Sequence, residues 1–268
     1  MEETPLLQGK HQIGFYGNVR LTLEIFLIEK SKIIFGSMRI TEHNYSDQHW
    51  INLFDLMYQK GIQLHHVSCE YYSFNLYCKL LSKFKSKYPG RIINHIVKLA
   101  EPNFENNIFS TKKLNQKIQL YQEKLQVNKI DTVQWMWRGS LDNEEKRLEL
   151  FLKQKNQIKD FVLKAKKEKK IKNFFVFPYT FSFAKECLNI SFIDGIVVYR
   201  NPSETFYDDL IVNCENVNKK CIVIRPFFSG KEIKSNLTAE KLISFSLNLK
   251  SIIGTIVSIS RPNQLNFC

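Results

Sequence analysis

Gly61-Ile-Gln-Leu-His-His-Val-Ser-Cys-Glu-Tyr-Tyr72 is the stretch that decides the fold. It begins with a glycine after an amphipathic segment, continues as a mainly apolar run from Ile62 to Val67, and ends in a polar loop that carries Tyr71. Such a run predicts a short buried strand. In a repeating strand–helix barrel, the chemistry lies at the carboxyl face, where strands end and loops begin. Two histidines, an acid and two tyrosines at one strand end therefore indicate a functional site.

The same alternation of strand and helix continues along the chain at spacings of roughly 25 to 40 residues, which predicts a single (β/α)8 TIM barrel domain over residues 1–268. A doubly wound open sheet is the alternative, but it requires a glycine-rich phosphate loop after its first strand, and the sequence has none there. The predicted strands are Ile33–Arg39, Ile62–Val67, Arg91–Leu99, Asp131–Trp137, Phe174–Phe177, Ile193–Tyr199, Cys221–Arg225 and Gly254–Ile259.

Apolar residues at helical spacing mark the segments between these strands. At the two ends of the chain, His11 to Ile28 alternates around Tyr16-Gly-Asn18, which predicts an N-terminal β-hairpin. Pro262 can begin a last helix, but this helix is short because Cys268 follows after little more than one turn. The predicted helices are Asp47–Lys60, Ser73–Lys87, Thr111–Gln126, Asn143–Lys169, Phe181–Leu188, Glu204–Cys214 and Thr238–Lys250.

Composition narrows the class of protein. The chain has 268 residues, 44% of them hydrophobic, and a formal net charge of +13. The lysines are spread along predicted helices, and the densest run, Lys164 to Lys172, is expected to be a solvated helix end. We therefore expect anionic small molecules as ligands and not nucleic acid. No apolar stretch is long enough for a membrane span, the start does not resemble a signal peptide, and the scattered cysteines form no metal or disulfide pattern. A cytoplasmic protein without a metal site is expected.

The opening stretch resembles the second-strand signature of the aldo-keto reductases, usually Gly-x-x-x-x-Asp-Thr-Ala-x-x-Tyr-Gly. Gly61 and Tyr71 match it, whereas His66 stands in place of the catalytic Asp and Tyr72 in place of the Gly. The resemblance extends from Ile33 to Leu265 and implies the family's barrel with its hairpin. Weaker matches follow in the family's order: Ile33-Ile-Phe-Gly-Ser-Met-Arg39, Glu101-Pro-Asn103, Ile130-Asp-Thr-Val-Gln134, Ile224-Arg-Pro-Phe227 with Ser229-Gly-Lys231, and Ile256 to Leu265.

The resemblance implies Tyr71 as proton donor and Lys98 as the residue that lowers the pKa of that tyrosine. Met136, followed by Trp137, stands where the family has His followed by Trp, so a donor worth roughly 3 to 4 kcal/mol of barrier is lost. Without the Asp, Lys98 loses the anion that holds its charge, and His66 cannot supply one. His66 directed into the mouth of the barrel would offer a replacement donor.

The resemblance also implies a site for NADP(H). Backbone amides from Ser258 to Arg261, followed by the helix start at Pro262, are expected to bind a phosphate, and Arg261 to contact an adenosine 2′-phosphate. A plain loop-to-helix junction is the alternative. The nicotinamide is expected near Asn201 and beneath the loop after the seventh strand, with Tyr199 or Phe227 stacked on its ring. The candidate cofactor-binding residues are Asn201, Arg225, Ser258, Ser260, Arg261 and Gln264.

These residues predict an NADP(H)-dependent oxidoreductase that reduces a carbonyl on a polar, sugar-like or anionic small molecule. One alternative is a degenerate barrel that binds a cofactor or a partner. Another is a lyase or epimerase that keeps Tyr71, Lys98 and His66 for proton transfer alone. A homodimer is also predicted, because a short last helix would leave an apolar seam uncovered, unless the hairpin or a long helix covers it. The seam residues are Ile34, Ile252, Ile253 and Ile256.

Overall fold

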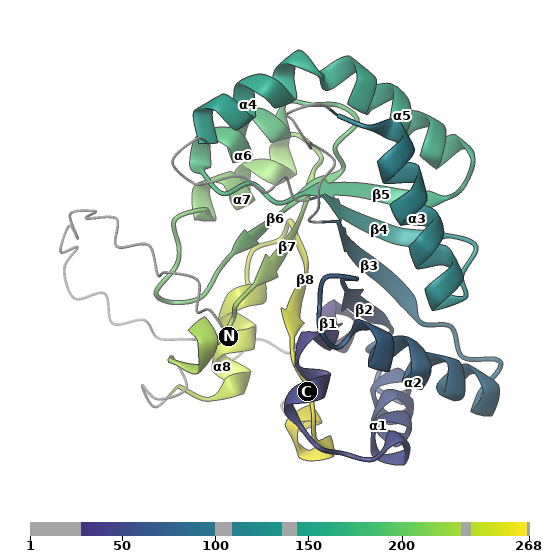
Figure 1. Ribbon diagram of the computed structural model, residues 1–268. Helices are drawn as coiled ribbons and strands as arrows, with labels where there is room; N and C mark the ends of the chain where they lie inside the picture. The colour runs from purple at the N-terminus through teal and green to yellow at the C-terminus, as the bar shows by residue number, and fades with distance from the viewer. Residues whose placement is uncertain (1–27, 100–108, 136–143, 232–236, 267–268) are drawn as a thin grey trace.

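Figure 1 shows the computed structural model, which describes residues 28–99, 109–135, 144–231 and 237–266. Within these residues eight parallel strands pair in chain order, and the last pairs with the first, so the sheet closes on itself. The predicted (β/α)8 barrel is thereby confirmed, and the open doubly wound sheet is excluded. The strands are β1 Ile33–Gly36, β2 Leu64–Val67, β3 Asn94–Leu99, β4 Ile130–Trp135, β5 Ile171–Val176, β6 Gly195–Tyr199, β7 Lys220–Ile224 and β8 Ile252–Val257.

Helices surround the barrel and cover its outer wall (Figure 1). The α-helices are α1 Asp47–Gln59, α2 Phe74–Lys87, α3 Thr111–Leu125, α4 Glu144–Lys153, α5 Lys155–Lys167, α6 Phe181–Leu188, α7 Asp208–Asn216 and α8 Ala239–Leu247. Short 3-10 helices are η1 Lys30–Lys32, η2 Ser37–Glu42, η5 Phe228–Gly230 and η7 Pro262–Leu265. The 3-10 helix η7 begins at Pro262, where the sequence predicts the start of a short last helix.

Gly61 ends α1 and sets the start of β2. Its φ of 83° lies in the left-handed region, which glycine adopts without steric cost. The Gly61 amide donates to the carbonyl of Tyr58 at 3.0 Å, and the Ile62 amide to the carbonyl of Met57 at 2.9 Å. These two bonds are the pair that closes a helix end in a Schellman motif. The helix end predicted from this glycine is thus confirmed.

Two apolar layers hold the barrel together. An inner cluster fills the space enclosed by the strands, and an outer cluster lies between strands and helices. Because side chains alternate along a strand, most strands contribute to both layers, whereas β4 places the polar Thr132 and Gln134 between its outer-cluster residues. The buried residues of the inner cluster are Ile34, Ile96, Phe175, Phe177, Val197 and Ile222.

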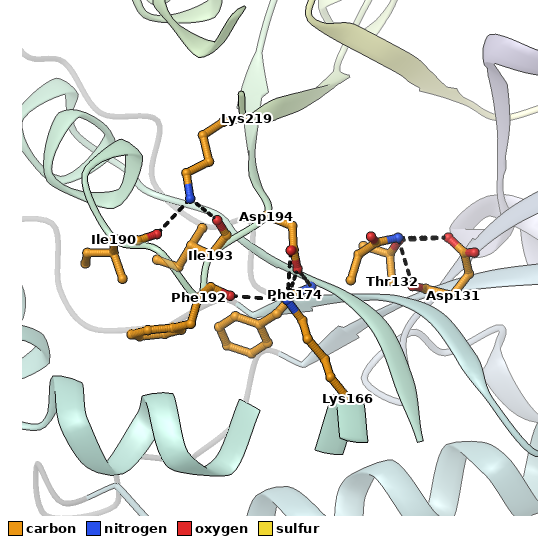
Figure 2. A network of polar contacts seen from close by, with 10 residues as sticks. Asp131, Thr132, Lys166, Phe174, Ile190, Phe192, Ile193, Asp194 and Lys219 are labelled. Carbon is orange, nitrogen blue, oxygen red and sulfur yellow. Dashed lines mark hydrogen bonds and ion pairs between the residues drawn. The ribbon is translucent and has the colours of Figure 1, made fainter. Parts of the chain in front are cut away.

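A polar network fixes the loop between α6 and β6 at the amino end of the barrel (Figure 2). Lys166 Nζ contacts both carboxylate oxygens of Asp194, at 2.7 and 2.6 Å, and Asp194 Oδ2 accepts a hydrogen bond from the Phe174 amide at 2.6 Å. Lys219 Nζ donates to the carbonyls of Ile190, at 2.8 Å, and Ile193. Lys166 belongs to the basic run predicted as a solvated helix end, but it is half-buried and ion-paired.

Several predicted boundaries are wrong. The structure has β5 Ile171–Val176, α7 Asp208–Asn216 and β8 Ile252–Val257 in place of Phe174–Phe177, Glu204–Cys214 and Gly254–Ile259. The single helix Asn143–Lys169 is two helices, α4 and α5, that meet at Gln154. Gln154 Oε1 accepts a hydrogen bond from the amide of Phe109, which lies far away in the sequence. The first strand ends at Gly36 instead of Arg39 and gives way to η2, and β2 begins at Leu64 instead of Ile62. The hairpin up to residue 27, Glu101-Pro-Asn103, Met136 and Trp137 lie outside the described residues.

The predicted apolar seam between β1 and β8 is also wrong. Ile34 and Ile252 are buried, with 0% and 1% of their surface exposed. Ile253 and Ile256 are partly buried and pack against the inner cluster. These four residues therefore leave no uncovered apolar strip, and the homodimer stays a prediction without this argument in its favour. In the described part of the chain, no helix combines the length and apolarity that crossing a membrane requires.

Candidate active site

Strand register brings His66, Lys98 and Gln134 together at the carboxyl end of the barrel. His66 on β2 pairs with Ile96 on β3, and Lys98 pairs with Gln134 on β4. Ile96 belongs to the inner cluster, and side chains two residues apart on a strand share a face. Lys98 therefore points into the mouth of the barrel, as do its neighbours His66 and Gln134.

His66 lies between Gln134 and Tyr71. Its Nε2 is 2.9 Å from Gln134 Oε1, and its Nδ1 is 3.5 Å from the hydroxyl of Tyr71. Because an amide oxygen accepts and does not donate, Nε2 carries the ring proton and Nδ1 is left to accept from Tyr71. The His66 ring thus points into the mouth as expected, but it gives its hydrogen bond to Gln134.

Burial lowers the pKa of His66 to about 4, with a smaller contribution in the same direction from the positive charge of Lys98. The hydrogen bond to Gln134 opposes this shift. At neutral pH the imidazole is therefore uncharged. His66 can orient the Tyr71 hydroxyl, but it adds no charge to the site.

Lys98 has an anionic neighbour that the sequence interpretation missed. Its side chain is buried, with Nζ 3.7 Å from Glu70 Oε2 and 5.2 Å from the centre of the Tyr71 ring. Glu70 thus supplies the negative charge that His66, which stands in place of the family's Asp, cannot supply. The signal was present in the sequence, because Glu70 directly precedes Tyr71 in the same loop.

Hydrogen bonds fix the loop that carries Glu70 and Tyr71. The Tyr71 amide donates to the carbonyl of Ser68 at 3.0 Å. Tyr121 on α3 accepts from the Cys69 amide at 2.7 Å and donates to the carbonyl of Lys98 at 2.8 Å. Since one phenol binds both the loop and β3, the positions of Tyr71 and Lys98 are coupled.

The neighbouring histidine, His65, faces the opposite way and does not belong to the site. It is fully buried in the outer layer, where its Nδ1 lies 2.9 Å from the hydroxyl of Tyr77. The same hydroxyl is 3.0 Å from His95 Nε2. Strand alternation explains why only one of two adjacent histidines reaches the mouth.

A group of hydrogen-bond donors converges after β8. The amides of Ser260 and Arg261 donate to Gln264 Oε1 at 2.8 and 3.0 Å, and the Ser260 hydroxyl does so at 3.3 Å. Ser258 and the Arg261 side chain are exposed beside it. These three donors, which we call the cradle, hold the Gln264 oxygen in the capping box that begins η7, and an anion in place of that oxygen stays a prediction.

Asn201 and Arg225 meet at the ends of β6 and β7. Asn201 is fully buried; its Nδ2 donates to Glu204 Oε2 at 2.5 Å and to the carbonyl of Arg225 at 2.9 Å. Its Oδ1 accepts from the Ser203 amide at 3.0 Å. These contacts give Asn201 a role in holding the loop, and a direct contact to a cofactor stays a prediction.

The described part of the chain contains no group of three or more His, Cys, Asp or Glu side chains placed to hold a metal ion. Its cysteines, Cys69, Cys78, Cys187, Cys214 and Cys221, are free thiols.

No protein-family model and no curated protein sequence matches the chain. Solved structures do. A protein from Pseudomonas aeruginosa assigned to the aldo-keto reductases has a TM-score of 0.67 at 15% identity, over 87% of this chain and 86% of its own. An aldo-keto reductase from Bacillus halodurans has a TM-score of 0.63 at 16% identity, over 88% of this chain and 84% of its own. An aldo-keto reductase from Klebsiella pneumoniae in complex with NADPH has a TM-score of 0.63 at 12% identity, over 87% of this chain and 82% of its own. The chain therefore has the barrel fold of the aldo-keto reductases.

Proposed function

We propose that the chain is an aldo-keto-reductase-like oxidoreductase that uses NADP(H) to reduce a carbonyl on a polar small molecule. The observation that carries the proposal is the arrangement of Tyr71, Lys98 and Glu70 at the carboxyl ends of β2 and β3. A phenol beside a buried ammonium is suited to donate a proton, because the ammonium stabilises the phenolate that remains. The Glu70 carboxylate keeps that ammonium paired.

Each residue then has a stated task. Tyr71 gives its hydroxyl proton to the carbonyl oxygen of the substrate, and Lys98 stabilises the phenolate. Before the substrate binds, the Tyr71 hydroxyl points its proton to Nδ1 of neutral His66, whose tautomer Gln134 fixes, and it turns this proton to the carbonyl oxygen when the substrate binds. When bound, NADP(H) would supply the hydride. The formal net charge of +13 on the chain favours substrates that are polar or anionic.

The cradle after β8 is the candidate site for the phosphate end of such a cofactor. The donors of Ser260 and Arg261 already converge on one oxygen, and a phosphate oxygen could replace that of Gln264. The exposed Arg261 would then meet the 2′-phosphate. The Klebsiella pneumoniae structure that shares this fold was solved in complex with NADPH, which supports the same choice of cofactor.

A second candidate function is proton transfer without a hydride, as in a lyase or epimerase. The contact between the Tyr71 hydroxyl and the unprotonated Nδ1 of His66 favours it, because it pairs an acid with a base. A third is a barrel that binds the cofactor without catalysis. Binding of NADPH, followed by fluorescence quenching, separates the second candidate from the other two.

The experiment that tests the proposal is a carbonyl screen with NADPH, monitored by the loss of its absorbance. The panel contains aldoses, keto acids and uncharged aldehydes of similar size. The proposal expects NADPH consumption that depends on at least one of these substrates. Tight NADPH binding without consumption would point to the binding module, and no NADPH binding would overturn the proposal.

A further inference from the structure

Arg225 adopts an unusual backbone conformation where the chain leaves β7. Its φ of 62° lies in the left-handed region, which residues other than glycine seldom occupy. Phe228 and Ser229 in the same loop also have positive φ values, of 46° and 56°. Such conformations persist when surrounding contacts hold them, and they cluster at ligand-binding sites. The contacts of Arg225 therefore bear on what this loop does.

The Arg225 guanidinium lies among two aromatic rings and a carboxylate. Its central carbon is 4.9 Å from the centre of the Tyr199 ring and 5.2 Å from that of Phe228. Its Nη1 donates to Glu204 Oε1 at 3.2 Å. Aromatic faces together with a carboxylate are how proteins bind planar cations. We call Tyr199, Phe228 and Glu204 the cation pocket.

The pocket does not depend on Arg225 for its negative charge. Buried Asn201 donates to the other carboxylate oxygen, Glu204 Oε2, at 2.5 Å. The backbones of Asn201 and Glu204 also exchange two hydrogen bonds, at 3.3 and 2.9 Å. The carboxylate therefore stays in place if the guanidinium leaves. The Arg225 side chain is 35% exposed, so it has a path to solvent.

We infer that Arg225 is an internal occupant of the cation pocket, and that the pocket's external ligand is the planar, positively charged ring of the oxidised nicotinamide cofactor. This inference rests on the proposed function and adds a preference to it. The ring of NADP+ is a planar cation, as the guanidinium is, whereas the ring of NADPH is uncharged. The pocket therefore favours the oxidised cofactor once Arg225 has moved out.

The sign of one mutational effect separates this role from an ordinary one. An arginine that binds a cofactor phosphate makes binding weaker when it is removed. An arginine that competes with the cofactor ring makes binding tighter when it is removed, although the cofactor is an anion overall. The two roles of Arg225 thus predict opposite changes in affinity for NADP+.

The test is isothermal titration calorimetry of the full chain with NADP+, NADPH and adenosine 2′,5′-bisphosphate, which lacks the nicotinamide. The variant is Arg225→Gly, because glycine accepts the left-handed φ. Lys172→Ala removes one positive charge at the amino end of the barrel, where Lys172 pairs with Asp131, and is the matched control. We expect Arg225→Gly to bind NADP+ about three- to tenfold tighter, since a partly exposed ion pair and cation–π contacts no longer compete.

Arg225→Gly should raise the affinity for NADPH less than the affinity for NADP+, and it should leave the affinity for adenosine 2′,5′-bisphosphate unchanged. Adding Glu204→Gln to Arg225→Gly should abolish the difference between NADP+ and NADPH. Unchanged or weaker NADP+ binding, with intact binding of the bisphosphate, overturns the internal-occupant role and leaves the proposed function standing. If none of the three ligands binds the wild type, both proposals fall. Should Arg225→Gly fail to fold by circular dichroism, Arg225→Asn gives the same readout, because asparagine also tolerates this conformation.

Discussion

The carboxylate of Glu70 lies 3.7 Å from the ammonium of Lys98, and both side chains are largely buried at the carboxyl ends of β2 and β3. Tyr71, the next residue after Glu70, places its ring over the same ammonium. Two consecutive residues of one loop therefore provide the negative charge and the proton donor of the site. His66 stands where the resemblance places the family's Asp, and the negative charge comes instead from Glu70, four residues later in the chain.

Glu70→Gln should lower the rate of carbonyl reduction by up to about 10²-fold, because Lys98 loses the charge that holds it beside Tyr71. The measurement is kcat with the best substrate of the screen, together with the affinity for NADPH. Glu42→Gln is the matched control, since Glu42 forms an exposed pair with Arg39. A Glu70→Gln enzyme with wild-type kcat would show that the ion pair has no part in catalysis.

The buried histidines should make the protein less stable in mild acid. Burial lowers the pKa of His65 to about 3 and that of His66 to about 4, against an ordinary value of 6.5, and it holds the pKa of His95 well below that value. Between pH 6.5 and 5 the unfolded chain therefore binds more protons than the folded one, so stability present above pH 6.5 is lost as the pH falls. Each such histidine contributes up to about 1.4 kcal/mol per pH unit.

Urea unfolding at pH 7, 6 and 5 measures this dependence. The free energy of unfolding should fall from pH 7 to pH 5. In the His66→Gln variant it should fall less steeply with pH, by the contribution of one histidine. A free energy of unfolding that is constant from pH 7 to 5 would contradict the neutral, buried state of these side chains.

Asp208→Asn should destabilise the fold by about 3 kcal/mol or more, because it leaves the buried charge of Arg200 uncompensated. Arg200 is 2% exposed and donates to both Asp208 oxygens, at 2.8 and 3.1 Å, and to the carbonyl of Phe245. Thermal unfolding provides the measurement. Glu215→Gln, which breaks the exposed pair with Lys250, should cost less than about 1 kcal/mol. Equal effects of the two variants would argue against a special role for the buried pair.

Arg261→Ala should reduce the preference for NADPH over NADH by about tenfold or more, the size of one charge-assisted hydrogen bond. The two dissociation constants, measured by fluorescence titration, give this ratio directly. The affinity for NADH should stay near that of the wild type. A wild type that binds both cofactors equally would refute the contact between Arg261 and the 2′-phosphate.

The sequence predicted the barrel because its strands and helices follow from local periodicity, and the resemblance to the aldo-keto reductases singled out Tyr71 and Lys98. A glycine that ends a helix and the alternation of side chains along a strand can be recognised in the sequence without knowledge of tertiary contacts. The break between α4 and α5 was not predictable, since it coincides with a hydrogen bond from the distant Phe109 to Gln154. Pairing of Lys98 with Glu70 likewise depends on how the loop after β2 folds back over β3. The positions of Ile34 and Ile256 were misjudged because a barrel strand is apolar on both faces.

Activity of Tyr71→Phe, set against that of Tyr72→Phe, tests the central claim most directly. Tyr72 is the adjacent residue and is 95% exposed, so its hydroxyl serves as a matched control. With the substrate found in the screen, Tyr71→Phe should lower kcat by about 10² to 10⁴-fold, the usual contribution of a positioned proton donor. Tyr72→Phe should retain wild-type kcat, and both variants should bind NADPH normally. A Tyr71→Phe enzyme that reduces the carbonyl at the wild-type rate would contradict the assignment of Tyr71 as the proton donor.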